Sequence, residues 1–330
     1  MKALVTGGGG FLGTAICRQL REAGHEVHSY SRQSYAHLEA LGVHCIRGQL
    51  GDGAALESAV QGRDTVFHVA AKAGVWGSRK AYHEANVLGT QNVIRACLKA
   101  GTSRLIHTSS PSVCFDGTDH RNADNTLPLA TRFLAVYPQT KAQAERDVLE
   151  ANGVQLATCA LRPHLIFGPG DPHLLPRLVQ MGRAGKLAQV GDGRNEVTMC
   201  FVENAAHAHL LAANSLSPTA PHAGKAYFIG QEDPVQLWDW IGQLFEQLQV
   251  PAIKKRVTRR TAYSMGVVLE IAWRMLPLSG EPPMTRFVAT QLASSHSYSM
   301  APAHADFGYR ELFNMQEATR LTLRWLREST

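Results

Sequence analysis

A tyrosine and a lysine four residues apart are the side chains of this sequence with the clearest chemical potential. They lie in the stretch Tyr137-Pro138-Gln139-Thr140-Lys141. A residue before proline avoids the α region and proline favours the first helical position, so we expect Tyr137 to cap a helix and Lys141 to lie one turn inside it. A nearby ammonium and the positive helix end would both lower the Tyr137 pKa from its usual value of about 10. Such a tyrosine can donate a proton to a ketone or remove one from an alcohol; the alternative is an ordinary helix contact.

A serine-rich turn offers a partner for this tyrosine. The residues Ser109-Ser110-Pro111-Ser112 follow a predicted strand at 104–108. They therefore lie at the carboxyl end of that strand, where open α/β sheets bind ligands. We expect Ser110 to polarise a substrate carbonyl beside Tyr137; the alternative is a serine that serves only the turn.

A run of glycines near the N-terminus predicts a phosphate-binding loop. The chain begins MKALVTGGGGFLG, with Gly7, Gly10 and Gly13 between an apolar strand at 3–5 and a helical pattern at 11–23. Gly7 permits a tight turn, Gly10 removes a side chain where the backbone approaches a pyrophosphate, and Gly13 lets the helix pack closely on the strand. The helix N-terminus adds unpaired N–H groups. We therefore predict a dinucleotide site, with a flexible glycine-rich loop as the alternative.

The second predicted strand, at 25–30, indicates which dinucleotide binds. NAD-binding proteins usually place Asp or Glu just after this strand, where it accepts a hydrogen bond from the ribose 2′-OH. No acidic residue occurs from Val27 to Leu38, and Ser31-Arg32 occupies that position. Arginine is a permanently charged, forked donor that suits a 2′-phosphate. We predict NADP over NAD; a solvated loop arginine is the alternative.

A repeated strand–helix pattern must position these residues. Further strands are predicted at 43–47, 65–69 and 156–161, and helices at 79–100 and 138–151. The pattern predicts an α/β fold of the Rossmann type, with a doubly wound parallel sheet. We assign residues 1–165 to an NADP-binding domain, to which a later segment near 195–235 returns. Residues 166–330 are expected to form a smaller C-terminal substrate-binding lobe.

Composition and charge restrict the class of protein. The 330 residues are 45% hydrophobic and 18% charged, as in ordinary globular proteins. The net charge of +6 favours anionic partners, but no aromatic-plus-basic module indicates nucleic acid. The six cysteines are scattered and read as reduced thiols, and the N-terminal apolar run is too short for a signal peptide or a membrane span. We therefore expect a cytoplasmic protein.

The histidines do not indicate a metal site. Fifteen are present, without a pattern that combines them with a carboxylate as a ligand set. His207 and His209 fall on a predicted helix and are expected to be structural or solvated. No metal is therefore expected.

A set of short motifs resembles one enzyme family. In chain order these are TGGGGFLG, HVAAKAG, NVLGTQNV, HTSSPSV, YPQTK, LRPHLIFGPGD and FVENAAHAHLLA, followed by LSGEPPMTR, SSHSYSM and FGYRE. Together they resemble the extended short-chain dehydrogenases/reductases, and most of all the 3β-hydroxysteroid dehydrogenase branch. The resemblance covers nearly the whole chain.

The resemblance implies roles for particular residues. Ser110, Tyr137 and Lys141 would be catalytic, Lys141 would also hold the nicotinamide ribose, and Asn86 would anchor the active-site helix. Where the family often has Asp-Leu beside the adenine, this chain has Gln49-Leu50. With the glycine loop, the expected cofactor contacts are Gly7, Gly10, Phe11, Leu12, Gly13, Ser31, Arg32, Gln49, Leu50, Ala70, Ala71, Lys72, Asn86, Tyr137, Lys141, Pro163, His164 and Ile166.

The resemblance also implies a substrate. Within the branch the chain is most similar to bacterial reductases of long-chain olefin biosynthesis, which implies reversible, NADPH-dependent reduction of a 2-alkyl-3-oxoalkanoic acid to the 2-alkyl-3-hydroxyalkanoic acid. Such a substrate is lipid-like and carries a carboxylate. The expected pocket residues are Trp76, Ser112 and Arg177, with a buried core role as the alternative for Trp76. Four cations could bind the carboxylate, and the sequence favours none of them over the others: Lys72, Arg79, Arg177 and Arg286.

Other functions stay open at this point. The nearest is a 3β-hydroxysteroid or sterol dehydrogenase with the same three catalytic residues, and a non-catalytic NADP(H)-sensing or scaffold protein is an alternative of another class. A sugar-nucleotide epimerase would need a nucleotide-diphosphate site, of which the sequence shows no clear sign. The resemblance implies a homodimer formed through the helices at 79–100 and 138–151, and an assembly with β-lactone-forming and decarboxylating enzymes.

A basic and then apolar segment at 254–278 is the last notable feature. Lys254-Lys255-Arg256-Val257-Thr258-Arg259-Arg260 precedes TAYSMGVVLEIAWRMLPL, which contains Glu270 and Arg274 and so is not a bilayer span. One interpretation is a core-packed helix beside solvated charges. The other is an amphipathic lid or a helix that contacts the inner membrane surface and handles an apolar substrate.

Overall fold

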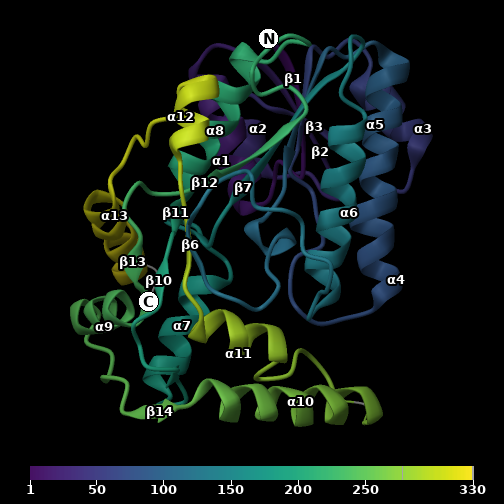
Figure 1. Ribbon diagram of the computed structural model, residues 1–330. Coiled ribbons are helices and arrows are strands. Elements are labelled where there is room, and N and C mark those ends of the chain that lie inside the picture. The colour runs from purple at the N-terminus through teal and green to yellow at the C-terminus, as the bar shows by residue number, and fades with distance from the viewer. Residues whose placement is uncertain (277, 329–330) are drawn as a thin grey trace.

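The central feature of the structure is a parallel β-sheet (Figure 1). The computed structural model describes residues 1–276 and 278–328. Within them, a seven-stranded sheet has the order β12-β7-β5-β4-β1-β2-β3, and every pairing is parallel. The doubly wound Rossmann-type sheet predicted from the sequence is confirmed. The strands are β1 (Lys2–Thr6), β2 (Glu26–Ser31), β3 (His44–Arg47), β4 (Thr65–His68), β5 (Arg104–Thr108), β7 (Ala157–Pro163) and β12 (Lys225–Ile229).

Helices cover both faces of this sheet (Figure 1). One layer contains α1 (Phe11–Glu22), α2 (Ala36–Ala40) and α8 (Val202–Ser215), and the other contains α3 (Gly53–Val60), α5 (Gly89–Ala100) and α6 (Val136–Glu150). The apolar spacing of α1 explains its place, because Leu12, Ile16 and Leu20 are all buried on one stripe against the sheet. The short α4 (Arg79–Tyr82) precedes α5, and a 3₁₀ turn covers Pro111–Val113.

Two predicted helices differ in detail from the observed ones. The helix expected at 79–100 is α4 and α5 joined by a π-helical segment, His83–Leu88, which contains Asn86. The expectation that Tyr137 caps a helix is wrong, because α6 begins at Val136 and the extended Ala135 is its N-cap. Pro138 is tolerated in the first turn, since the first N–H groups of a helix have no intrahelical partner to lose.

The smaller lobe is built from segments on both sides of residue 165. Its four-stranded sheet has the order β13-β10-β15-β6, and β6 comes from between β5 and α6. Conversely, α8 and β12 belong to the layers of the large sheet. The lobe strands are β6 (His120–Ala123), β10 (Glu196–Val197), β13 (Val235–Gln236) and β15 (His296–Tyr298), with the pairs β8 (Ile166–Phe167)–β11 (Cys200–Phe201) and β9 (Ala188–Val190)–β14 (Lys255–Val257). The remaining helices are α7 (Leu174–Arg183), α9 (Leu237–Gln247), α10 (Arg259–Met275), α11 (Arg286–Ala293), α12 (Ala301–Phe307) and α13 (Met315–Glu328).

The basic and apolar segment forms β14 and α10. The helix predicted at 261–278 begins earlier, at Arg259, after Thr258 caps it by accepting a hydrogen bond from the Thr261 N–H, and it ends at Met275. Pro277, which falls in the predicted segment, lies outside the described residues. None of the helices in residues 1–276 and 278–328 is long and apolar enough to cross a bilayer.

A buried ion pair fixes α6 to the sheet. Glu145 on α6 is fully buried and accepts two hydrogen bonds from Arg162 on β7, one from Nε at 2.8 Å and one from Nη2 at 2.6 Å. This fork-to-fork geometry offsets the cost of removing both charges from water. Glu145 lies one turn beyond Lys141, so the pair also sets the height of the candidate catalytic residues along the sheet.

We predict that Glu145→Gln lowers the free energy of unfolding by about 3–5 kcal/mol, because it leaves the Arg162 guanidinium buried without its counter-charge. Urea denaturation checks this. The double variant Glu145→Leu/Arg162→Met should recover most of the loss. The control Glu84→Gln removes the exposed pair between Lys80 and Glu84 and should cost less than about 1 kcal/mol. A Glu145→Gln cost no larger than that of the control would contradict the assigned role of the pair.

Candidate active site

The three expected catalytic residues meet at the carboxyl end of β5. Ser110 follows β5, and its hydroxyl lies 2.9 Å from the hydroxyl of Ser112. Tyr137 lies in the first turn of α6, and its phenol forms a hydrogen bond with Ser110. Lys141 lies one turn further into the same helix. The structure therefore brings the hydroxyls of Ser110 and Tyr137 together, as the sequence predicts, with the Lys141 amine one helical turn away.

Lys141 is bonded to the strand behind it. Its side chain is buried, Nζ donates to the Thr108 carbonyl oxygen at 2.6 Å, and Nζ lies 3.1 Å from Nε2 of His107. Burial lowers the pKa of Lys141 to about 7. Burial and the adjacent Lys141 hold the pKa of His107 well below its usual range, so His107 is neutral and can accept from the ammonium. No sequence pattern singles out His107, apart from its place in a buried strand.

The Tyr137 phenol differs from the expectation. Burial raises the pKa of Tyr137, and the hydrogen bond with Ser110 only partly opposes this. The predicted lowering by Lys141 is therefore wrong for this structure. The physical reason is that the Lys141 Nζ is turned toward His107 and the Thr108 carbonyl. The phenol consequently keeps its proton at neutral pH and is suited to donate it.

Asn86 joins the active-site helix to the loop that follows β4. Its side-chain oxygen accepts from the Lys72 backbone N–H at 2.7 Å, and its side-chain nitrogen donates to the Lys72 carbonyl at 3.1 Å and to Thr140 Oγ1 at 3.1 Å. Asn86 is buried. The residue thus fixes Lys72 and, through Thr140, the turn of α6 that carries Lys141.

The glycine loop has the close approaches that its spacing predicts. Gly7 has a φ of +72°, and a Cβ there would lie 2.9 Å from the Ala70 Cα. A Cβ on Gly13 would collide with the Gly7 carbonyl oxygen. Gly10 is the N-cap of α1, so the N–H groups of Phe11 and Leu12 have no intrahelical partner. Ala71 follows Ala70 in the adjoining loop, where it is exposed.

The Tyr35 ring covers the glycine loop, a feature that the sequence did not indicate. A Cβ on Gly9 would collide with this ring. Nothing in the glycine spacing identifies the partner of Gly9, because Tyr35 precedes α2, a separate element. Gly9 is therefore restricted by a side chain from outside the loop.

The end of β2 holds the residues expected at the ribose. Ser31 ends β2, and Arg32 follows as an exposed cation. In the parallel pairing of β2 and β3, Ser31 is aligned with Arg47, whose Nε donates to Ser34 Oγ at 3.1 Å. Arg47 was not predicted, and it adds a second guanidinium to this corner of the sheet.

Four other residues that were expected to contact the cofactor lie at strand ends or in loops beside the sheet, and two of them form hydrogen bonds through their backbone carbonyls. The Gln49 carbonyl accepts from the Tyr30 hydroxyl at 3.0 Å, and the Leu50 carbonyl accepts from Asn92 at 2.7 Å. Pro163 ends β7 and Ile166 begins β8. The His164 ring is buried, with Nε2 2.6 Å from Nδ1 of His296 on β15, so this side chain joins the large sheet to the lobe.

Among the expected substrate residues, Trp76 contacts Tyr82, a residue that was not predicted. The Tyr82 ring centroid lies 6.4 Å from that of Tyr137, and its hydroxyl donates to the carbonyls of Ala73 and Trp76, both at 3.2 Å. The Arg274 guanidinium carbon lies 5.4 Å from the Trp76 ring centroid. The end of α10 therefore approaches the loop that follows β4.

The four candidate cations can now be distinguished. Arg286 pairs with Glu270 at 2.8 Å, Arg177 lies 3.5 Å from Glu281, and Arg79 donates to the Gln139 amide at 3.3 Å. Within residues 1–276 and 278–328, Lys72 has no ion-pair partner, and its Nζ lies 5.2 Å from the Tyr82 ring centroid. Arg79 also lacks an ion pair in this part of the chain, but its guanidinium is bonded to Gln139, whereas Lys72 contacts the Tyr82 ring, which lies next to Tyr137.

No cluster of three or more His, Cys, Asp or Glu residues suited to a metal ion occurs in the described part of the chain. His209 is buried and bonded, with Nε2 2.8 Å from Thr108 Oγ1 and Nδ1 2.7 Å from the Ala205 carbonyl oxygen. Its place under β5 is structural. His207 is partly buried on the same helix.

Comparison with known proteins agrees with this geometry. The model of the 3-beta hydroxysteroid dehydrogenase/isomerase family matches residues 4–258. The chain is 49% identical to a 2-alkyl-3-oxoalkanoate reductase of Stenotrophomonas maltophilia over 97% of this chain and 98% of that protein. It is 36% identical to the mouse sterol-4-alpha-carboxylate 3-dehydrogenase, decarboxylating, over 98% and 90% of the two chains. Among solved structures, MoeE5 in complex with UDP-glucuronic acid and NAD superposes with a TM-score of 0.75 at 24% identity over the full length of both chains.

The sheet order, the glycine loop and the Ser110–Tyr137–Lys141 site define an extended short-chain dehydrogenase/reductase, an oxidoreductase of hydroxyl and keto groups. Within that class, the chain belongs to the 3-beta hydroxysteroid dehydrogenase/isomerase family.

Proposed function

We propose that this enzyme uses NADPH to reduce a 2-alkyl-3-oxoalkanoic acid to the 2-alkyl-3-hydroxyalkanoic acid, reversibly. The observation that carries the proposal is the protonated Tyr137 phenol bonded to Ser110 and followed by Lys141 one turn later. The near-full-length similarity to a reductase of this name supports the substrate.

The names of the two relatives share one piece of chemistry. A 2-alkyl-3-oxoalkanoate carries its ketone one carbon away from the carbon that bears the carboxylate. A sterol-4-alpha-carboxylate oxidised at C3 has the same relation between its oxygen and its carboxylate. The shared class is a 3-oxo or 3-hydroxy acid on an apolar skeleton, and we assign this class to the present site.

The residues present fit a bound nicotinamide dinucleotide. The glycine loop exposes backbone without side chains, and the start of α1 offers unpaired N–H groups for the pyrophosphate. When bound, NADPH supplies the hydride for C3 of the substrate. Tyr137 donates its proton to the carbonyl oxygen, and Ser110 hydrogen-bonds that oxygen as negative charge develops. The C=O bond thus becomes CH–OH, with the hydride on carbon and the proton on oxygen.

The preference for NADP over NAD rests on the corner formed by β2 and β3. Arg32 is exposed, Arg47 is aligned with Ser31, and the chain has no acidic residue from Val27 to Leu38. A 2′-phosphate would gain charge-assisted hydrogen bonds here, whereas a plain ribose lacks the usual carboxylate acceptor.

We predict that Arg32→Ala weakens NADPH binding by about tenfold or more while it changes NADH binding less than about twofold, since only NADPH carries the phosphate. Quenching of protein fluorescence gives both dissociation constants without catalysis. Equal losses for the two cofactors would remove Arg32 from the phosphate site.

The activity is tested best in the oxidative direction, because 3-oxo acids decarboxylate on their own. The wild-type enzyme with NADP⁺ should form NADPH from a racemic long-chain 2-alkyl-3-hydroxy acid. We predict that Tyr137→Phe lowers kcat about 10²- to 10⁴-fold and leaves NADPH binding within about twofold, because only the transferred proton is lost. Tyr263→Phe, on α10, is the matched control and should keep wild-type turnover.

A 3β-hydroxysteroid run in parallel decides between the two substrate classes. NADPH formed only from the steroid would overturn the oxoacid assignment in favour of a steroid dehydrogenase. Undiminished turnover by Tyr137→Phe would overturn the catalytic assignment itself. The homodimer and the assembly with β-lactone-forming and decarboxylating enzymes stay predictions.

Lys72 is the cation that we assign to the substrate carboxylate. Asn86 bonds both backbone groups of Lys72, and the ammonium lies over the Tyr82 ring beside Tyr137. A carboxylate two bonds from the reacting carbon would lie within reach of the loop that follows β4. Attraction between the two charges would orient the ketone toward Tyr137.

We predict that Lys72→Met raises KM for the 2-alkyl-3-hydroxy acid by about tenfold, a loss of about 1.4 kcal/mol, and leaves KM for the matching secondary alcohol without a carboxylate unchanged. Steady-state kinetics on both substrates check this. The control Lys80→Met, an exposed lysine on α4, should change neither. An equal rise in KM for the two substrates would show that Lys72 does not recognise the carboxylate.

A further inference from the structure

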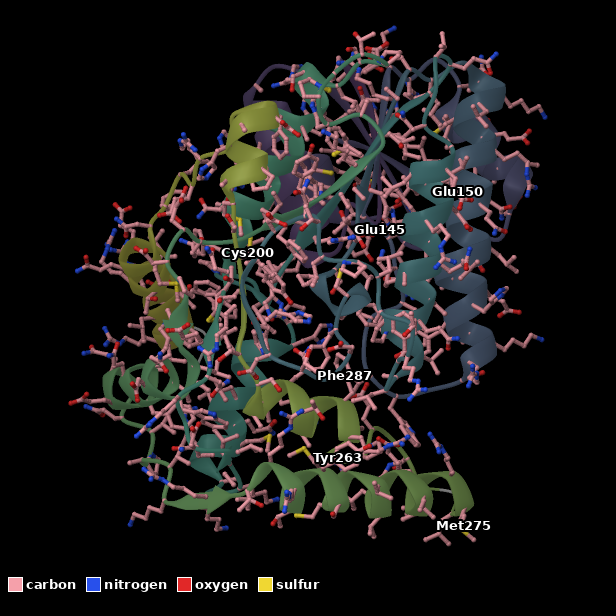
Figure 2. All side chains as sticks on the ribbon, viewed as in Figure 1. Glu145, Glu150, Cys200, Tyr263, Met275 and Phe287 are labelled. Carbon is pink, nitrogen blue, oxygen red and sulfur yellow. The ribbon has the colours of Figure 1, made fainter. Side chains whose placement is uncertain are left out.

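Helix α10 presents apolar side chains to solvent. Met265, Val268, Ile271 and Met275 follow one another at spacings of three and four residues and share its outer side. Their exposed fractions are 45%, 65%, 48% and 79%, and that of the following Leu276 is 54%. We call these five residues the α10 outer face. The helix runs along the lower margin of the molecule in Figure 1, and Figure 2 shows Met275 at its outer end.

The inner side of α10 carries the charge instead. Glu270 is buried and accepts from the Arg286 backbone N–H at 2.8 Å and from its Nε at 2.9 Å. A Cβ on Gly266 would lie 2.6 Å from the Arg286 nitrogen, so the two helices touch backbone to backbone. These contacts with α11 fix the rotation of α10. The helix therefore cannot turn its apolar residues inward without breaking a buried ion pair.

A cluster of cations adjoins the outer face at the N-terminal end of α10. Lys254, Lys255, Arg256, Arg259 and Arg260 are all exposed, and no acidic residue occurs from Gln247 to Leu269. Lys255 Nζ donates to the Gly185 carbonyl at 3.1 Å and Arg259 donates to the Gly117 carbonyl. None of the five has an ion-pair partner in residues 1–276 and 278–328. Arg256 lines a surface hollow together with the exposed Asp192 and Asp239, and the cluster as a whole keeps an excess of positive charge.

We propose that the α10 outer face binds the surface of an anionic lipid bilayer. A helix that lies in the membrane interface buries an apolar side among the acyl chains near the headgroups. Adjacent lysines and arginines contact anionic headgroups, which adds an attraction that salt weakens. The α10 outer face supplies the apolar side chains, and residues 254–260 supply the cations.

Charge distinguishes this occupant from a second copy of the chain. A two-fold interface pairs one surface patch with itself. Residues 247–269 contain five cations and no acidic residue, so two copies that paired this segment with itself would bring positive charges together. An anionic lipid bilayer offers negative headgroups to the cations and acyl chains to the apolar side chains.

The same helix connects the outer face to the substrate side. The guanidinium of Arg274, in the last turn of α10, lies over Trp76 in the loop that follows β4. A substrate with long alkyl chains partitions into lipid, and a membrane-bound α10 would place the active-site loop next to that supply. Vesicle binding itself does not depend on the proposed reaction and is measured without substrate.

The test is co-sedimentation of the full chain with sucrose-loaded vesicles of phosphatidylcholine, with and without phosphatidylglycerol. The wild type is expected to sediment with the anionic vesicles and to be released by high salt. Val268→Glu/Met275→Glu should weaken this binding about tenfold or more, because it places charge on the face that inserts. Val154→Glu, at an exposed valine in the turn after α6, is the matched control and should bind like the wild type.

A second variant separates the electrostatic contribution to vesicle binding from the apolar contribution. Lys254→Gln/Arg256→Gln/Arg260→Gln should bind the two vesicle types equally. Turnover of a short, soluble 3-hydroxy acid should stay at the wild-type level in every variant, which shows that each is folded. Equal binding by the wild type and Val268→Glu/Met275→Glu, or no binding to either vesicle, would overturn the proposal. So would a wild-type dimer that the same double variant dissociates, because the occupant would then be a second copy.

Discussion

The ion pair between Glu145 and Arg162 is the interaction on which the rest of the site depends. It joins α6 to β7 in a buried setting where an unpaired charge would be very costly. The Arg162 guanidinium carbon also lies 5.0 Å from the Phe228 ring centroid on β12, and Phe228 stacks on Tyr298 of β15 at 4.1 Å. One buried charge thus holds the active-site helix, two strands of the large sheet and a strand of the lobe in a single arrangement. Figure 2 shows Glu145 on α6, with the lobe helix that carries Phe287 below it.

Burial also affects the charge state of Tyr137 and Lys141, the candidate catalytic pair. Moving a phenol out of water raises its pKa and moving an amine out of water lowers its pKa, so burial favours the neutral form of both Tyr137 and Lys141. The proposed reduction of a ketone uses a proton on the phenol, and the raised pKa of Tyr137 keeps that proton in place at neutral pH. Oxidation of the alcohol needs the phenolate, which requires a protonated Lys141 close by.

Most of the fold, and the meeting of Ser110 and Tyr137 at the end of β5, could be predicted because the signals are local. Gly7, Gly10 and Gly13 lie between one strand and one helix, and the Tyr137–Lys141 spacing lies within a single helical turn. The errors concern contacts between segments distant in the chain. Whether Lys141 turns toward Tyr137 or toward His107 depends on the packing of α6 against β5, and no spacing rule contains that information. The pairing of β6 with β15 joins residues about 175 positions apart, and Arg47 reaches the ribose corner only through the register of β2 and β3.

The orientation of α10 also depends on contacts between segments that are distant in the chain. In the sequence, Glu270 within an apolar stretch is evidence against a bilayer span, and on a solvent-exposed helix it would be expected on the water side. The structure places it inward because Arg286 and the backbone approach at Gly266 stabilise it there. The apolar side chains are then left outward by geometry, since a helix held by one side cannot bury the opposite side. The proposed contact with an anionic bilayer would remove this apolar surface from water and would place the cations at 254–260 against anionic headgroups.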